Sequence, residues 1–169
     1  MNDRRFTSNT SLAWYATIVL TATYTFSFID RQIVNLLVEP IKADLLLSDT
    51  QISFLQGLAF VVPYLILSIP VGRLVDTVSR VKVLIGGIIF WSVACVFCGL
   101  SKTMTQLAIG RMGVGAGEAS VTPAAWSLLA DYFPEDKRGL PVSIFLMGPY
   151  LGAGLSLIIG AEVCLLYTS

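Results

Sequence analysis

Residues 26–40 read FSFIDRQIVNLLVEP, and this stretch decides what kind of protein the chain forms. It continues a run of 18 uncharged residues, 12–29, which has the length and apolarity of a membrane span. Asp30 and Arg31 follow side by side, before a further apolar run at 33–38. Each charge costs about 3 kcal/mol at the centre of a bilayer. We therefore expect both side chains to face the inside of a helix bundle or a wet cavity, not lipid.

The composition as a whole is that of a membrane protein. Only 13% of the 169 residues are charged and 55% are hydrophobic, whereas soluble domains carry about 25% charged residues. The apolar residues fall in long runs, with no soluble domain between them. The formal net charge is zero and Lys and Arg form no cluster, which argues against nucleic-acid binding.

The chain contains no histidine, which excludes His-based metal sites, His general bases and Ser-His triads. Its cysteines are Cys95, Cys98 and Cys164. The spacing Cys95-x-x-Cys98 could indicate redox chemistry or half a zinc site. Because the pair lies inside an apolar run without a second pair of ligands, we interpret it as small residues that pack between helices. We predict neither a metal nor a cofactor.

Five segments are long and apolar enough to cross a bilayer, so we predict an all-α membrane protein with five transmembrane helices. The helices lie near residues 12–38, 50–75, 83–100, 105–132 and 140–161. Pro40 is expected to stop the first helix, and Ser48 or Asp49 to cap the second. Residues 1–11 would form a cytoplasmic tail. The last residues, 162–169, do not match the pattern, and we interpret them as a truncated or foreign tail.

Basic residues are distributed unevenly between the two ends of the predicted bundle. If the N-terminus is cytoplasmic, the outer side holds only Lys42 and Lys102. Cytoplasmic loops carry an excess of Lys and Arg. We therefore predict a multi-pass protein with a cytoplasmic N-terminus, in a bacterial inner membrane. The inner basic residues are Arg4, Arg5, Arg73, Arg80, Lys82, Lys137 and Arg138.

The fourth segment carries a second pair of charges. Arg111 and Glu118 are two helical turns apart and share one face. Counted along the spans, Asp30, Arg31 and Arg111 lie at a similar depth, with Glu118 nearer the bilayer centre. The simplest pairing joins Asp30 to Arg111 and Arg31 to Glu118. The four could be a structural ion-pair network, but buried pairs often add little net stability. We favour a functional role, in which proton uptake or substrate binding at these residues biases a cavity to open to one side.

Other residues near this level are candidates to line the cavity, although most membrane aromatics simply pack or face lipid. They are Tyr24, Phe28, Tyr64, Thr122 and Trp126. Several spans also carry proline, which membrane helices tolerate and which either curves a helix or lets it bend as a cavity opens. These prolines are Pro63, Pro70, Pro123 and Pro149.

The loop between the second and third segments, GRLVDTVSRVK at 72–82, resembles the loop signature of the major facilitator superfamily, G-x-x-x-D-[RK]-x-G-[RK]-[RK]-[RK]. Gly72, Asp76, Arg80 and Lys82 fit the signature, whereas other positions depart from it. The resemblance implies a cytoplasmic gating motif in which Asp76 caps a neighbouring helix and Arg80 pairs with an acid. Asp131, at the inner end of the fourth segment, is the expected partner of Arg80.

Within the superfamily, the stretches IDRQIVNLLVEPIKADLLLSDTQIS and RMGVGAGEASVTPAAWSLLADYFP look most like the spinster-like transporters. The resemblance implies that Asp30, Arg31, Arg111 and Glu118 serve proton coupling and substrate handling, with sphingolipid-type or lysophospholipid cargo in some members. It also implies a fold of two six-helix halves. The chain would then form an incomplete N-terminal six-helix half of a major facilitator fold, without the C-terminal half.

We therefore expect the N-terminal part of a secondary active transporter, and two readings of the chain stay open. In the first, the chain belongs to a proton-coupled carrier that moves an organic anion or an amphipathic lipid-like solute by alternating access. In the second, it is a non-transporting truncated or split membrane partner that needs another chain. A membrane enzyme with Asp30 and Glu118 as an acid/base pair is not expected, because no nucleophile-and-base arrangement accompanies them.

Overall fold

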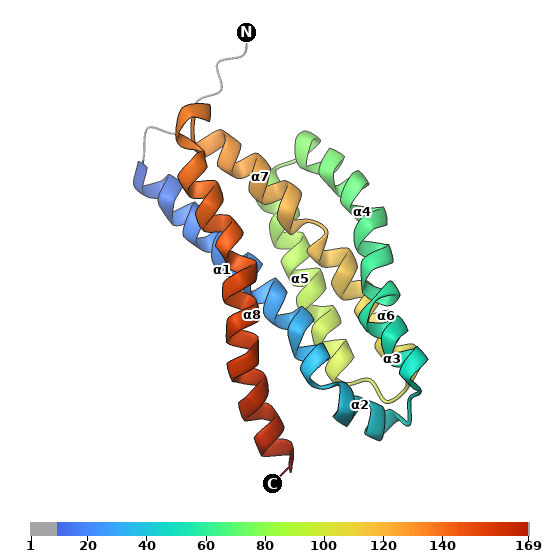
Figure 1. Cartoon of the computed structure of the whole chain (residues 1–169). Helices are drawn as coiled ribbons and strands as arrows, with labels where there is room; N and C mark the ends of the chain where they lie inside the picture. The colour runs from blue at the N-terminus through green and yellow to red at the C-terminus, as the bar shows by residue number, and fades with distance from the viewer. Residues whose placement is uncertain (1–9, 169) are drawn as a thin grey trace.

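Helices are the only regular structure in the part of the chain that the computed structural model describes, residues 10–168, with side chains over 10–160. The apolar runs of the sequence form five long segments (Figure 1). Short α2 (Val38–Leu45) and a single 3-10 turn, η1 (Glu135–Lys137), lie between them. The five are α1 (Thr10–Leu36), α3 (Asp49–Gln56) continued by α4 (Leu58–Thr77), α5 (Arg80–Gly99), α6 (Met104–Glu118) continued by α7 (Val121–Tyr132), and α8 (Gly139–Thr168).

Two of the helix boundaries have the same cause. Pro40 and Pro123 are each the third residue of a helix, α2 and α7 respectively. A proline in the first turn removes only an N–H that has no partner within that helix, but it prevents a preceding helix from running on. Consequently α1 ends at Leu36 and Pro40 lies inside α2, and the segment predicted as one helix over 105–132 is two, with a break after Glu118.

The start of the second segment is capped as the sequence predicts. The Ser48 hydroxyl accepts a hydrogen bond from the Gln51 backbone N–H at 3.3 Å, and the Gln51 side chain accepts one from the Ser48 N–H at 2.9 Å. This reciprocal capping box satisfies two donors at the helix end. The helix is interrupted at Gly57 and resumes as α4.

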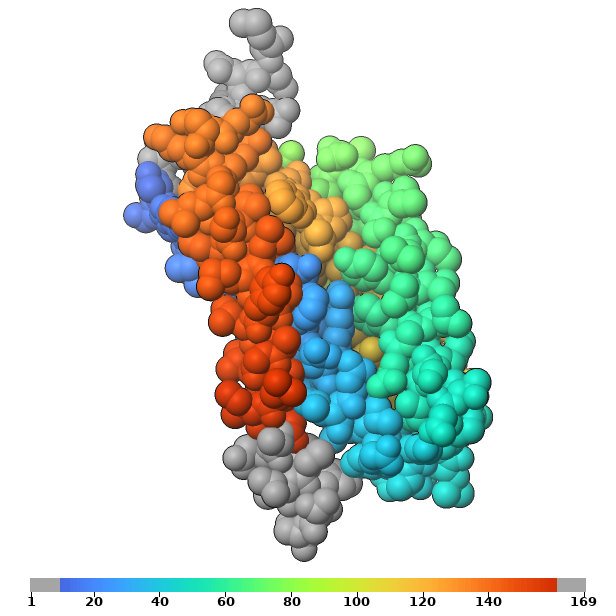
Figure 2. Space-filling view, in the orientation of Figure 1, coloured from blue at the N-terminus to red at the C-terminus, as the bar shows by residue number. Residues whose placement is uncertain are grey.

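The α6–α7 segment lies at the centre of the packing. It contacts α1, α4, α5 and α8, while α8 packs mainly along α1. Figure 1 shows α1 and α8 side by side, with α4 on the opposite side of the bundle, and Figure 2 shows α8 covering part of α1. The core draws side chains from several of these helices, among them Phe145, Leu129, Val114 and Val75, each at most 2% exposed. Charges carried by α6 are therefore placed in the interior.

Many large apolar side chains lie on the outer surface of the bundle. Ile66 and Ile69 on α4, and Val93 and Val96 on α5, are 64–65% exposed. Such a surface is unfavourable in water but suits contact with lipid tails. Four helical stretches are long and apolar enough to cross a membrane, covering residues 10–36, 49–77, 80–99 and 139–160. The remaining crossing predicted from the sequence falls on α6 and α7, which have 15 and 12 residues.

The last segment is longer than the sequence predicts. The tail expected at 162–169 begins inside α8, whose backbone stays helical through Thr168. The side chains of 161–169 lie outside the described residues, as do residues 1–9 of the predicted N-terminal tail.

Candidate functional site

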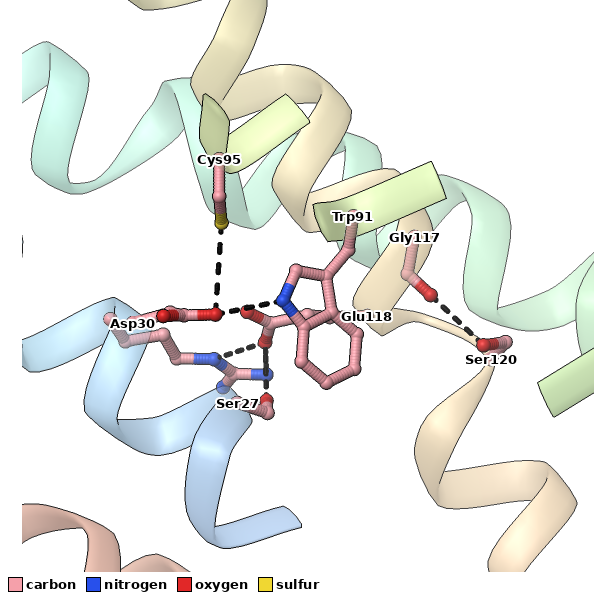
Figure 3. Close-up of polar contacts among 8 residues, drawn as sticks. Ser27, Asp30, Trp91, Cys95, Gly117, Glu118 and Ser120 are labelled. Carbon is pink, nitrogen blue, oxygen red and sulfur yellow. Dashed lines mark hydrogen bonds and ion pairs between the residues drawn. The ribbon is translucent and has the colours of Figure 1, made fainter. Parts of the chain in front are cut away.

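The charged pair of α1 points toward two different helices because adjacent residues on a helix lie about 100° apart. Ser27 and Arg31 are four residues apart and share the face toward α6, where Glu118 lies. Asp30, on the neighbouring face, reaches α5 instead (Figure 3). The two adjacent charges that decide the fold therefore enter two separate sets of contacts.

Glu118 is the centre of the first set. Its residue is 1% exposed, and one carboxylate oxygen, Oε2, accepts hydrogen bonds from the Arg31 Nε–H and from the Ser27 hydroxyl, each at 2.6 Å. The Arg31 Nη2 lies 2.6 Å from the same oxygen. The other oxygen, Oε1, is buried and has no hydrogen-bond partner among the described residues. The ion pair predicted between Arg31 and Glu118 is confirmed.

Asp30 is the centre of the second set. The Trp91 indole N–H donates to Asp30 Oδ2 at 2.7 Å, and the Cys95 thiol lies 3.6 Å from the same oxygen. Trp91 and Cys95 are one turn apart on α5. No ion pair joins Asp30 to Arg111 among the described side chains, so that predicted pairing is wrong. The physical reason is that the Asp30 carboxylate already has two donors on α5, Trp91 and Cys95, and does not need Arg111 of α6 as a partner.

Arg111 is buried without the partner that the sequence suggests. The residue is 3% exposed, and its Nε has no hydrogen bond among the described residues. Its guanidinium carbon lies 5.1 Å from the centre of the Phe60 ring. A cation over an aromatic face is attracted by the ring quadrupole, but this does not replace the hydrogen bonds of the guanidinium. Arg111 therefore retains unused capacity to bind an anion.

Aromatic rings surround the other arginine. The Arg31 guanidinium carbon lies 5.0 Å from the Phe28 ring centre, 4.7 Å from that of Phe60 and 5.2 Å from that of Tyr64. Phe60 thus contacts both arginines. Sequence reasoning selected Phe28 and Tyr64 but missed Phe60, although its position one turn before Tyr64 on α4 is the signal that could have identified it.

The remaining cavity candidates fall in different places. Tyr24 stacks on Phe145 of α8 at 4.8 Å between ring centres and lies close enough to Thr122 to interact with it. Trp126 is 45% exposed and lines a groove with Arg138, where α7 meets α8. The structure therefore brings Tyr24 and Thr122 toward the charged cluster and leaves Trp126 apart from it.

The loop signature is realised only in part. Arg80 forms an ion pair with Asp131, as the resemblance implies, and so links α5 to α7. Asp76 is exposed and makes no hydrogen bond within the described residues, so its role as a helix cap stays a prediction. Gly72 has open space where a side chain would be, and Lys82 is exposed.

Arg138, which the sequence analysis counted only among the inner basic residues, caps the end of α7. Arg138 donates from Nε to the Phe133 carbonyl at 2.7 Å and from Nη2 to the Ala130 carbonyl at 2.8 Å. These carbonyls lie at a helix C-terminus, where a cation is favourable. No group of three or more potential metal ligands occurs within residues 10–160.

Comparison with known proteins gives one consistent family. The family model described as Major Facilitator Superfamily matches residues 20–168. An MFS-type efflux pump of Mycolicibacterium smegmatis is 35% identical over 148 residues, which are 88% of this chain and 34% of that protein. A probable L-galactonate transporter of Escherichia coli is 30% identical over 77% of this chain and 28% of its own length. Protein spinster homolog 1 of Homo sapiens is 31% identical, over 81% of this chain and 26% of its own.

Solved structures agree with these relatives. A bacterial homolog of the human lysosomal transporter Spinster, in an inward-facing and unoccupied conformation, superposes with a TM-score of 0.88. It is 34% identical, and the match covers 92% of this chain and 32% of that one. The inward-facing and occupied conformation gives a TM-score of 0.84. The chain spans between about a quarter and a third of the length of these relatives and structures.

Proposed function

Because this chain belongs to the major facilitator superfamily and is spinster-like, we propose that it supplies N-terminal helices of a proton-coupled secondary active transporter. The cargo is an organic anion or an amphipathic lipid-like solute. The observation that carries the proposal is the buried carboxylate of Glu118, which holds Arg31 from inside a membrane-spanning bundle. An intramembrane ionisable pair of this kind marks a substrate or proton path.

Coupling follows from the bonding of Glu118. Its ionised form accepts the Arg31 and Ser27 hydrogen bonds on one oxygen. Proton uptake removes the negative charge that holds the Arg31 guanidinium and leaves Arg31 free to bind another anion. A solute that binds only when Glu118 is protonated changes the balance between the two orientations of the bundle, since a ligand shifts such an equilibrium by its differential affinity.

The surroundings suit a solute with a charged head and an apolar body. Arg31 and Arg111 provide guanidinium groups, which match a carboxylate or phosphate by paired hydrogen bonds. Phe28, Phe60 and Tyr64 provide apolar contact beside them. One relative is named as a probable transporter of L-galactonate, which carries a carboxylate.

The test is uptake into proteoliposomes under an imposed pH gradient, with radiolabelled galactonate and a labelled lysophospholipid as probes. We expect uptake that depends on the gradient, and we expect Glu118→Gln to abolish that dependence. Ser143→Ala, an exposed position on α8, serves as the control and keeps it. Gradient-dependent uptake that survives unchanged in Glu118→Gln would refute the role of this residue.

The alternative is that the chain is a membrane partner that does not transport by itself. The same assay separates the two readings. Uptake by this chain alone supports the carrier, whereas uptake only after co-reconstitution with a chain that carries the remaining helices supports the split partner.

The membrane placement that we propose is multi-pass, in a bacterial inner membrane, with the N-terminus in the cytoplasm. The basic residues of the α4–α5 connection and of the η1 region support this orientation, because both connections would then be cytoplasmic. Protons, the bilayer and the C-terminal half of the fold are the partners that the proposal requires.

A further inference from the structure

Asp30 is held by α5 rather than by the arginine that would neutralise it. The Trp91 indole N–H lies 2.7 Å from Asp30 Oδ2, and the Cys95 thiol adds a weaker contact to the same oxygen. A hydrogen bond to an ionised carboxylate is roughly twice as strong as one between neutral groups. Figure 3 shows the two contacts meeting at one Asp30 oxygen, with Cys95 above it and Trp91 to its right.

Trp91 is fixed in place by its packing. Its side chain is 5% exposed and belongs to the main core cluster. Gly117 of α6 lies against it, and a Cβ added to Gly117 would be only 2.7 Å from the Trp91 Cβ. The close approach of α6 fixes the Trp91 backbone and Cβ, and burial in the packed core restricts the rotamers of the indole, so its N–H keeps one direction. Asp30 therefore meets a rigid donor.

This arrangement leaves Arg111 without an ion pair to Asp30. Arg111 is 3% exposed, its Nε has no hydrogen bond among the described residues, and it lies close enough to Asp30 to interact electrostatically. An unpartnered buried guanidinium is unfavourable unless something else satisfies it. The Asp30 carboxylate, if released from Trp91, would be a candidate partner.

We propose that Trp91 is a positioning residue for Asp30: its indole N–H holds the carboxylate against α5, which keeps Arg111 available to an anionic group of the solute. The inference rests on the proposed function only in making the solute an anion. The other titratable groups near Asp30 are Arg31 of α1, Cys95 of α5, and Arg111 and Glu118 of α6. Residues 139–160 of α8 carry no charge.

The first experiment measures anion binding with a defined probe, dodecyl phosphate, by calorimetry on the chain in lipid nanodiscs. Trp91→Phe removes the N–H and keeps an aromatic ring, so Asp30 can turn to Arg111 and compete with the probe. We expect binding to weaken about tenfold, the effect of one charge-assisted hydrogen bond. Trp126→Phe, a half-exposed tryptophan away from the cluster, is the matched control and leaves binding unchanged.

The decisive comparison uses Asp30→Asn. If Trp91 acts through Asp30, adding Trp91→Phe to Asp30→Asn has no further effect on binding. If Trp91→Phe weakens binding equally with and without Asp30→Asn, or not at all, the positioning role is overturned. A purely structural tryptophan would give the equal effect, because loss of packing does not depend on the Asp30 charge.

The second experiment does not require any solute and so separates this inference from the transport function. Trp14→Phe combined with Trp126→Phe leaves Trp91 as the sole tryptophan of the three. We expect its fluorescence to change with pH as Asp30 gains a proton, and the change to disappear in Asp30→Asn but persist in Glu118→Gln. A pH response that survives Asp30→Asn, or no response at all, contradicts the contact. If the response appears but no variant binds or transports an anion, the proposed function fails and the positioning contact stands.

Discussion

The hydrogen bond from the Ser27 hydroxyl to Glu118 can be tested by removing that single hydroxyl. Ser27 is fully buried and donates to the same Glu118 oxygen as Arg31. We expect Ser27→Ala to lower the free energy of unfolding by about 2 kcal/mol, since a hydrogen bond to a charged group contributes about 1.5–3 kcal/mol. Unfolding in detergent, followed by circular dichroism, measures the change. Ser143→Ala is the control: its exposed hydroxyl bonds only to the Gly139 carbonyl, and equal losses at both positions would refute the assignment.

The Phe60 ring contacts the guanidinium groups of both Arg31 and Arg111. Because it contacts both guanidinium groups and Tyr64 contacts only Arg31, Phe60→Leu removes two cation–π contacts where Tyr64→Leu removes one. Each contact contributes about 0.5–2 kcal/mol. We expect the larger loss of stability for Phe60→Leu, measured in the same unfolding assay. A larger loss for Tyr64→Leu would mean that the contacts with the guanidinium groups are not what Phe60 contributes.

Residue contacts were predictable where charge alone decides them. The Arg31–Glu118 pair follows from opposite charges on two spans, and Arg80–Asp131 follows from the loop signature. The partner of Asp30 does not follow, because an indole N–H is neutral and Trp91 looks like any other apolar residue in its span. The site therefore differs from the sequence prediction where a neutral donor replaces an ion pair.

Among the helices, the contact between α1 and α8 depends on missing side chains. A Cβ at Gly152 would lie 2.5 Å from the Thr25 carbonyl oxygen and 2.7 Å from the Phe28 Cβ. We expect Gly152→Ala to destabilise the chain by about 1–3 kcal/mol, the usual effect of overpacking. Gly154→Ala is the matched control two residues along the same helix, where an added Cβ meets nothing within 4 Å. It should be neutral or stabilise by up to about 1 kcal/mol, and the reverse order of the two variants would contradict this packing.

The helices themselves were predictable from apolar length, but the interruptions within them were not. Hydropathy is continuous across Leu37, and the few polar residues around Ser120 do not interrupt the apolar span, so hydropathy does not reveal that the chain starts a new helix at either place. The signal lies in Pro40 and Pro123, each the third residue of the following helix. A proline inside an apolar run is compatible with a kink as well as with a restart, and only the local hydrogen bonding separates the two.

For the molecule as a whole, the proposed orientation can be measured with single cysteines. In a background that lacks Cys95, Cys98 and Cys164, Lys102→Cys and Glu135→Cys place one thiol on each of two exposed connections. We expect a membrane-impermeant maleimide to label Lys102→Cys in intact cells and Glu135→Cys only after permeabilisation. The opposite pattern would place the N-terminus outside, and labelling of both in intact cells would contradict the alternation of the spans.

The break between α6 and α7 has a consequence for reading the topology of this chain. Neither helix is long enough to be counted, so counting unbroken apolar helices gives four traverses. An even number returns the polypeptide to the compartment where it started, whereas an odd number leaves it in the other. A reporter enzyme active only in the periplasm, fused after residue 160, would be active if the interrupted segment crosses and inactive if it does not. If one crossing is left out of the count, every later segment is assigned to the wrong side of the membrane.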